Sequence, residues 1–144
     1  MPQGSKPGRF RPWVAAVLCA VAAAALYLPT LSFPLVWDDV DLVVRTSATP
    51  AQAFTQSFWQ NRTGATGRDG YYRPLVNLSL ALDRMLVGPM PWYFHLVNLL
   101  LHGGVVFIFC LLLAQLFSSA WAVLSGGLLF GLHPLTVEPV AWIG

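Results

Sequence analysis

The sequence predicts an all-α integral membrane protein with about three transmembrane helices and a long extracytoplasmic loop that carries two short juxtamembrane helices. Of the 144 residues, 56% are hydrophobic and only 10% are charged, whereas about a quarter of the residues are charged in a soluble domain. Three apolar segments approach the length that crosses a bilayer. The basic residues are spread along the chain, so no nucleic-acid partner is expected.

The first transmembrane helix is expected at residues 13–33, after a cytoplasmic tail of residues 1–12. The tail holds three basic residues and no acid, and an Ala/Val/Leu run follows it until Pro29. This pattern also describes a secretory signal peptide. The next residues, LPTLSFPLVW, remain apolar and bulky and offer no small-residue cleavage site, which favours an uncleaved helix.

Residues 34–91 are predicted to form an extracytoplasmic loop, because a basic tail favours a cytoplasmic N-terminus. A short helix is expected to begin at Thr49-Pro50, a capping residue followed by proline at the first helical position. Phe54 and Phe58 would lie one turn apart on one face of that helix. The Gly/Thr/Arg-rich stretch of residues 61–70 is expected to be a flexible excursion.

A second loop helix is predicted from Pro74 through the sequence LVNLSLALDRML. Its polar side chains lie largely away from the apolar face. That arrangement is typical of a helix that lies in the membrane interface. The apolar face consists of Leu75, Leu78, Leu82, Met85 and Leu86.

Two further spans are predicted at residues 92–117 and 118–144. Trp92, Tyr93 and Phe94 open the first of them as an aromatic belt. His133-Pro134 interrupts the other, so the third span is either kinked or ends there. Cys19 and Cys110 fall inside apolar helices, where inert thiols are expected and a disulfide or metal role is not.

Three membrane crossings gather six chemically interesting residues on one side of the membrane. The acidic motif follows the first span, the second span begins on the same side, and the third span returns to it. This placement holds for either orientation of the chain. The six residues are Asp38, Asp39, Arg73, His95, His133 and Glu138.

Asp38 and Asp39 form the most suggestive pair in this group. Adjacent carboxylates repel each other, so one of them acquires a raised pKa that suits a general base. An isolated pair of this kind is more often a solvated helix end.

His95, Asn98 and His102 share one face of the second span. Hydrogen bonding between helices is the simpler role for Asn98 and His102, which lie deeper, whereas His95 is the better site candidate. Two histidines at this spacing supply only two ligands for zinc, so no metal site is predicted.

Arg73 and the break in the third span complete the candidate site. Arg73 precedes the interfacial helix, where its guanidinium could bind a phosphate or simply extend to the headgroups. His133 and Glu138 stand beside prolines, and irregular backbone at membrane depth is tolerated where it is buried or lines a cavity.

Four motifs occur in the order VWDD, YYRPLVNLSLALDR, FHLVNLLLH and LLFGLHPLTVEPVAWIG. Their order resembles the N-terminal part of the transmembrane-and-TPR O-mannosyltransferase-like proteins, over about residues 33–144. These belong to the GT-C class of polytopic glycosyltransferases. That family has many more spans and often C-terminal tetratricopeptide repeats, and Pro139 replaces its usual alanine. We therefore expect a fragment of a larger GT-C fold that is inactive alone.

The resemblance implies an inverting glycosyltransferase that uses a sugar linked to a polyprenyl phosphate. By this resemblance, Asp38 or Asp39 would be the general base that takes the proton from an acceptor hydroxyl.

 Arg73, His95, His133 and Glu138 would bind the substrate, with the cations steadying the phosphate. No cofactor is certain, and a divalent metal is compatible with the reaction but not required.

The implied partners are the lipid bilayer, the lipid-linked sugar donor and a protein or other hydroxyl acceptor. The expected location is a bacterial inner (plasma) membrane, crossed several times, with the acidic loop outside the cytoplasm. Two other classes stay open. A membrane scaffold would leave the acids merely solvated, and a transporter would spread its polar residues through the depth of the membrane.

Overall fold

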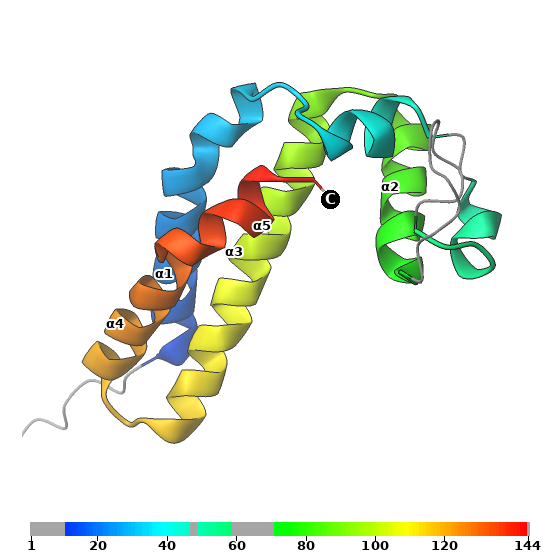
Figure 1. The fold of residues 1–144 in the computed structure, drawn as a ribbon. Helices are drawn as coiled ribbons and strands as arrows, with labels where there is room; N and C mark the ends of the chain where they lie inside the picture. The colour runs from blue at the N-terminus through cyan, green and yellow to red at the C-terminus, as the bar shows by residue number, and fades with distance from the viewer. Residues whose placement is uncertain (1–10, 47–48, 59–70, 144) are drawn as a thin grey trace, which may run out of the picture. The chain divides into compact units, whose positions relative to one another are not determined.

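The computed structural model describes residues 11–46, 49–58 and 71–143, and every regular element in these ranges is helical (Figure 1). This confirms the predicted all-α class. The chain divides into two compact units. We call Met1–Leu28 with Leu99–Glu138 the helical unit, and Pro29–Asn98 with Pro139–Gly144 the loop unit. The tail of residues 1–10 and the excursion at 61–70 lie outside the described residues.

Two described helices are long and apolar enough to cross a membrane. One runs from Pro12 to Ser32 and contains α1 (Pro12–Tyr27) with the 3-10 helix η1 (Leu28–Ser32). The other is α3 (Pro91–Leu116). These lengths support the prediction of an integral membrane protein.

The segment predicted as a third span is a pair of helices separated by a break. Helix α4 (Ala120–Gly131) is followed by the 3-10 helix η4 (Pro134–Thr136) and by α5 (Val137–Ala141), with a bend of 50° across the break. Proline cannot donate a backbone hydrogen bond, so the helix is interrupted at His133-Pro134. The described chain therefore has two spans, or three if the bent pair counts as one.

The core of the helical unit is built from small residues that let α1 and α4 approach closely. Ala15, Ala16, Cys19 and Ala23 are the buried residues of α1 in this core, and α1 packs directly against α4. In α4, a Cβ atom added at Gly127 would lie 2.8 Å from the Cys19 sulfur and would also overlap the Cys110 sulfur of α3. Close packing of small residues is a usual way for helices to associate in a membrane.

Polar side chains in the helical unit make hydrogen bonds between its elements. The Nε2 atom of His102 lies 3.0 Å from the carbonyl oxygen of Gly131. The Tyr27 ring meets the His102 ring edge-on at 5.3 Å, and the Tyr27 hydroxyl lies 2.8 Å from the hydroxyl of Thr136. These contacts confirm the interpretation of His102 as an interhelical hydrogen-bonding residue.

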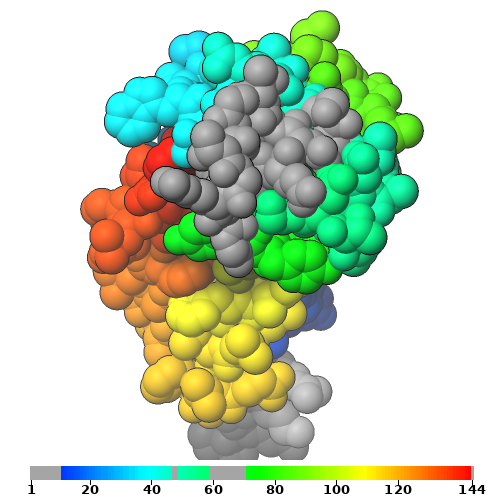
Figure 2. Space-filling view, turned by 45° about the vertical axis from the view of Figure 1, so that its right-hand side comes forward, coloured from blue at the N-terminus to red at the C-terminus, as the bar shows by residue number. Residues whose placement is uncertain are grey.

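The outer surface of the helical unit is strongly apolar. Figure 2 shows the side chains of α3 and α4, in yellow and orange, covering this part of the molecule. Exposed apolar areas of this extent are typical of surfaces that meet lipid or protein. On α3 the exposed large side chains are Leu100, Leu101, Val105, Ile108, Leu112 and Leu116.

The loop unit combines short helices with the beginning of α3. It contains the π-helical turn η2 (Val40–Val44), the 3-10 helix η3 (Pro50–Phe54) and α2 (Pro74–Val87), and α2 packs against η3. Helix η3 begins at Pro50 as predicted, and Thr49 and Gln52 form a capping box there. The buried core of this unit consists of Leu42, Val43, Phe58, Phe94 and Ile143.

The predicted shared face of Phe54 and Phe58 is wrong. Helix η3 ends at Phe54, and the backbone N–H of Phe58 donates to the carbonyl oxygen of Tyr71 at 2.9 Å. The Phe58 side chain therefore enters the core and is 5% exposed, whereas Phe54 is 53% exposed. A long-range backbone hydrogen bond replaces the helical turn that the sequence favoured.

Helix α2 has its apolar side outward and a polar side chain inward. Leu75, Met85 and Leu86 are each more than 70% exposed, whereas Asn77 and Ala81 are buried. Only residues 88–90 separate α2 from α3, so the end of α2 lies within about 15 Å of the start of that span along the chain. This placement favours a helix in the membrane interface.

Candidate functional site at the acidic motif

The acidic motif begins with a turn at Trp37, whose backbone conformation is strained. Trp37 has a φ angle of +50°, a left-handed conformation that costs roughly 1–2 kcal/mol for a side chain with a Cβ atom. Two backbone hydrogen bonds close the turn. The N–H of Asp39 donates to the carbonyl oxygen of Val36 at 3.0 Å, and the N–H of Val40 donates to that of Trp37 at 3.2 Å. Strained backbone of this kind clusters at functional sites.

The two carboxylates that follow this turn lie in opposite environments. Asp38 is exposed, whereas Asp39 is 0% exposed. One oxygen of Asp39 accepts a hydrogen bond from the backbone N–H of Ile143 at 3.1 Å, and the other accepts from Val36 at 3.4 Å. Asp39 thus holds the segment near Ile143 against the acidic motif, whereas Asp38 is the carboxylate that remains accessible to solvent.

Burial raises the pKa of the Asp39 carboxyl above its ordinary value of 3.8. The hydrogen bonds from Ile143 and Val36 lower this pKa, as does the nearby imidazole of His95, but they do not offset the loss of solvation. The neighbouring charge of Asp38 acts in the raising direction. Asp39 therefore holds its proton to a higher pH than a solvated aspartate does.

His95 is the second buried polar group of this site. Its side chain is 1% exposed, and its ring meets the Phe33 ring edge-on with the ring centres 6.4 Å apart. The carboxylate of Asp39 lies close enough to interact electrostatically with the His95 ring. Among the described residues neither ring nitrogen makes a hydrogen bond of good geometry, and the nearest polar interaction is with the backbone of Phe33. A buried polar atom without a partner costs about 1–3 kcal/mol, so His95 is a group that a ligand or water could satisfy.

Residues 139–143 complete the site. The side-chain amide of Asn98 donates to the carbonyl oxygen of Trp142 at 2.7 Å, and the Trp142 ring lies 6.3 Å from that of Trp37. The Nε1 atom of Trp142 is buried and has no partner among the described residues. The acidic motif, the start of α3 and this segment therefore meet within the loop unit. We define the acidic site as Trp37, Asp38, Asp39, His95 and Trp142.

The remaining predicted site residues have other surroundings. In the loop unit, the Arg73 guanidinium lies over the rings of Phe58 and Tyr71, at 5.2 and 5.6 Å. In the helical unit, Nδ1 of His133 accepts a hydrogen bond from the backbone N–H of Leu135 at 3.2 Å and so caps η4. Glu138 is exposed in the first turn of α5. Of the predicted set, Asp39 and His95 lie close enough in the loop unit for their charges to interact.

Trp142 and Ile143 were not among the site residues predicted from the sequence. Ile143 acts through its backbone N–H, which no side-chain pattern encodes, and Trp142 is apolar in any periodicity argument. The signal that could have found this segment is the run of small and aromatic residues after Pro139 in an otherwise aliphatic span. Among the described residues there is no cluster of three or more His, Cys, Asp or Glu side chains that could hold a metal ion.

Replacing Asp39 by asparagine should flatten the pH dependence of stability. Because the pKa of Asp39 is raised in the folded state, its contribution to stability is fully present below pH 3.8 and is lost as the pH rises through the folded-state pKa. The amide oxygen still accepts from Ile143 but does not titrate. Unfolding of the chain, followed by tryptophan fluorescence between about pH 3 and about pH 7, measures this slope. An unchanged slope in Asp39→Asn would contradict the burial of this carboxylate. Asp83, whose pKa is also raised by burial, accounts for the slope that remains.

The fold and the site define a helical membrane protein with an acidic motif held beside the start of a span. The chain is 37% identical over 133 residues to protein O-mannosyl-transferase Tmtc2 of Drosophila melanogaster, covering 88% of this chain and 14% of the relative. It is 34% identical over 137 residues to protein O-mannosyl-transferase TMTC2 of Homo sapiens, with 90% and 16% covered. For protein O-mannosyl-transferase TMTC1 of Homo sapiens, the identity is 32% over 136 residues, with 90% and 15% covered.

Over 88–90% of its length the chain is therefore homologous to TMTC protein O-mannosyl-transferases, and this confirms the resemblance seen in its motifs. It spans 14–16% of the length of these curated relatives. No family model and no solved structure matches the chain.

Proposed function

We propose that the chain forms the N-terminal part of a membrane glycosyltransferase that moves a sugar from a polyprenyl-phosphate donor to an acceptor hydroxyl on a protein. The observation that carries this proposal is the acidic motif of the loop unit, with one exposed and one buried carboxylate. Homology to proteins named for protein O-mannosyl transfer supports the reaction class. Mannose is accordingly the sugar to test first.

Asp38 is the proposed general base. Its exposure lets it approach an acceptor hydroxyl, whereas both oxygens of Asp39 face backbone N–H groups. Asp38 takes the proton of the hydroxyl, whose oxygen then attacks the anomeric carbon of the sugar. The bond from that carbon to the phosphate oxygen breaks, the configuration inverts, and the polyprenyl phosphate leaves with the electron pair. Asp39 is a positioning residue that holds the acidic motif against the segment near Ile143.

Arg73, His95, His133 and Glu138 are proposed to assist with the substrate. The Arg73 guanidinium, exposed and stacked over aromatic rings, suits a phosphate because its donors form a planar fork. The N–H of the buried His95 imidazole would donate to the leaving group once the donor enters the site. His133 and Glu138 flank the break in the third span and would bind the donor from there.

The cellular placement is part of the same proposal. The acidic site would lie outside the cytoplasm, at the outer face of a bacterial inner (plasma) membrane, where a lipid-linked donor and a protein acceptor can meet. The spans would anchor it in the bilayer, as the length and apolar character of α1 and α3 support. The rest of the transferase would supply further spans to enclose the lipid donor.

A donor comparison tests the proposed function. The complete protein that contains this chain is reconstituted in liposomes with a threonine-containing peptide and either polyprenyl-phosphate mannose or a nucleotide-linked mannose. We expect mass spectrometry to detect mannosylated peptide with the lipid donor only, and NMR to show an inverted anomeric centre. Transfer from the nucleotide donor alone, or from neither donor, would refute the proposal. The second result would favour the scaffold interpretation.

A further inference from the structure

An exposed tryptophan stands directly before the proposed general base. Trp37 is 83% exposed, the highest value among the exposed large hydrophobic side chains of the described residues. An indole ring carries a large apolar area, and its removal from water is favourable. The exposed ring next to Asp38 therefore calls for an occupant in the complete protein.

The backbone at Trp37 does not explain why a tryptophan stands there. Its φ angle of +50° is one that glycine adopts without strain and that a residue with a Cβ atom does not. Local geometry alone would therefore favour glycine at this position. A bulky side chain at a strained position indicates a role for the side chain itself, which here is the indole ring.

A second indole holds the ring of Trp37 in place. The centres of the Trp37 and Trp142 rings lie 6.3 Å apart, with their planes at 75°. The carbonyl oxygen of Trp142 accepts a hydrogen bond from Asn98 at 2.7 Å. The backbone N–H of the next residue, Ile143, donates to Asp39 at 3.1 Å. All five residues belong to the loop unit. A ring that is held before a ligand arrives loses less conformational freedom on binding.

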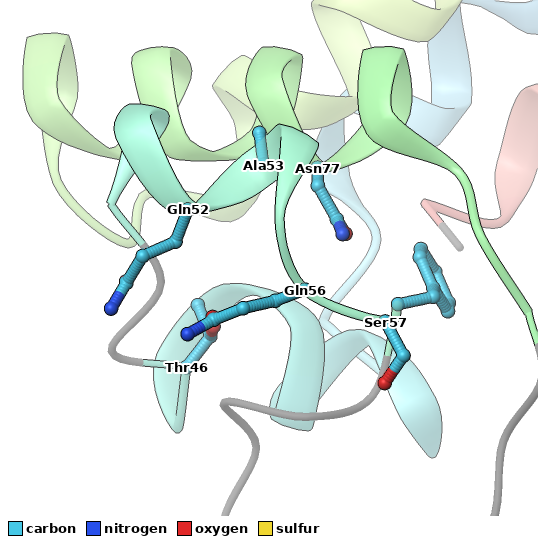
Figure 3. Close-up of a pocket in the computed structure, with 7 residues that line it drawn as sticks. Thr46, Gln52, Ala53, Gln56, Ser57 and Asn77 are labelled. Carbon is cyan, nitrogen blue, oxygen red and sulfur yellow. The ribbon is translucent and has the colours of Figure 1, made fainter.

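Polar side chains elsewhere in the loop unit offer no comparable free surface. Figure 3 shows Asn77 directed from α2 toward the segment that carries Gln56. Around the same hollow, four side chains already interact with other groups of the protein, namely those of Thr46, Gln52, Gln56 and Ser57. The ring of Trp37, by contrast, is largely uncovered.

The surroundings of Trp37 favour a sugar ring over a hydrocarbon chain. Asp38 is exposed beside it, and Asp41 forms a surface ion pair with Arg45. Charged groups are costly next to hydrocarbon, so this surface faces water. A pyranose suits both features. Its hydroxyl groups hydrogen-bond to water and to carboxylates, and the C–H hydrogens on its face carry a small positive charge that is attracted to the negative face of an indole.

We propose that Trp37 is the stacking platform for the sugar ring of the donor. The inference rests on the proposed function, because the anomeric carbon must lie beside the base when the acceptor oxygen attacks it. Trp37 adjoins Asp38, with the two Cα atoms about 3.8 Å apart. A sugar that stacks on the indole therefore lies close to the residue that takes the proton.

Saturation-transfer NMR on the complete protein in lipid nanodiscs tests this inference. The probes are methyl α-mannoside, which is neutral and so makes no phosphate contact, and mannitol, which has the hydroxyl groups of mannose on an open chain without a ring face. We expect a saturable signal from the mannoside that is strongest for the C–H groups on one face of the ring, and none from mannitol. Equal signals from the two probes, or no signal from the mannoside, would overturn the proposal.

Three variants assign the signal to the indole. Trp37→Leu keeps an apolar side chain without a flat ring and should weaken binding by about two- to tenfold, the value of one aromatic contact. Trp37→Phe keeps a smaller aromatic face and should lose less. Trp121→Leu is the matched control, because Trp121 is 80% exposed on α4 of the helical unit, and it should bind as the wild type does. Equal losses in Trp37→Leu and Trp121→Leu would assign Trp37 to lipid contact and overturn the proposal, as would wild-type binding by Trp37→Leu.

Trp37→Gly separates binding from folding. Glycine adopts the positive φ angle without strain, so the thermal midpoint of this variant should stay close to that of the wild type while its binding falls as in Trp37→Leu. This variant carries the test if Trp37→Leu does not fold. Wild-type affinity for the mannoside in Trp37→Gly would contradict a role for the indole.

Transfer kinetics with the lipid-linked donor separate this inference from the proposed function. Trp37→Leu should raise the KM for the donor by about the same factor as it weakens mannoside binding, whereas Asp38→Asn should lower kcat. Binding that depends on Trp37 in a protein that transfers no sugar would refute the proposed function alone. Transfer with the same KM in the wild type and in Trp37→Leu would refute the stacking platform alone.

Discussion

Replacing Asp38 by asparagine is expected to lower sugar transfer by the complete protein by at least about a hundredfold. A positioned general base contributes roughly 10²- to 10⁴-fold to a rate, and asparagine keeps the size of the side chain while it removes the proton acceptor. Asp38 is exposed on a turn that begins at the strained Trp37, so the substitution should leave the fold intact. The measurement is the initial rate of mannosyl transfer to a threonine peptide at matched protein levels.

Asp41→Asn is the matched control for this prediction. Asp41 lies three residues further along, and its carboxylate already pairs with Arg45 at 2.9 Å on the surface. A surface pair one helical turn apart contributes little to stability, so Asp41→Asn should keep nearly the wild-type rate. If Asp38→Asn were fully active and Asp39→Asn inactive, the buried carboxylate would be the base and the assignment of roles would be reversed.

Replacing Gly127 by alanine is expected to destabilise the helical unit by about 1–3 kcal/mol, the usual cost of overpacking. The new Cβ atom would overlap the sulfur of Cys110 and would lie 2.8 Å from that of Cys19, so the three helices must separate to admit it. Alanine has the higher helix propensity, by about 1 kcal/mol, and the packing penalty must exceed this gain. Thermal unfolding of the purified chain in detergent, followed by circular dichroism, measures the difference.

Gly103→Ala on α3 provides the control, since nothing lies within 4 Å of a Cβ atom at that position. It should be as stable as the wild type or more stable. Cys110→Ala removes the overlapping sulfur, so the double variant Gly127→Ala with Cys110→Ala should recover part of the lost stability. Equal stability of Gly127→Ala and Gly103→Ala would show that α4 does not approach α1 and α3 as closely as described.

Local sequence features predicted the membrane class, the family and several helix starts. Two of the spans follow from length and apolar composition, because a bilayer demands both whatever the packing. Helix η3 begins after Thr49 and α2 begins at Pro74, since capping and proline act on the nearest backbone groups. The order of four motifs was sufficient for the family, which the relatives confirm.

Tertiary structure decided which of two identical neighbouring residues is buried. Asp38 and Asp39 have the same side chain and adjacent positions, so no local rule distinguishes them. The difference arises because Asp39 accepts a hydrogen bond from Ile143, 104 residues away along the chain. The entry of Phe58 into the core likewise depends on the backbone of Tyr71. Periodicity depends only on a residue and its neighbours along one helix or strand. Burial depends on which other elements pack against that residue.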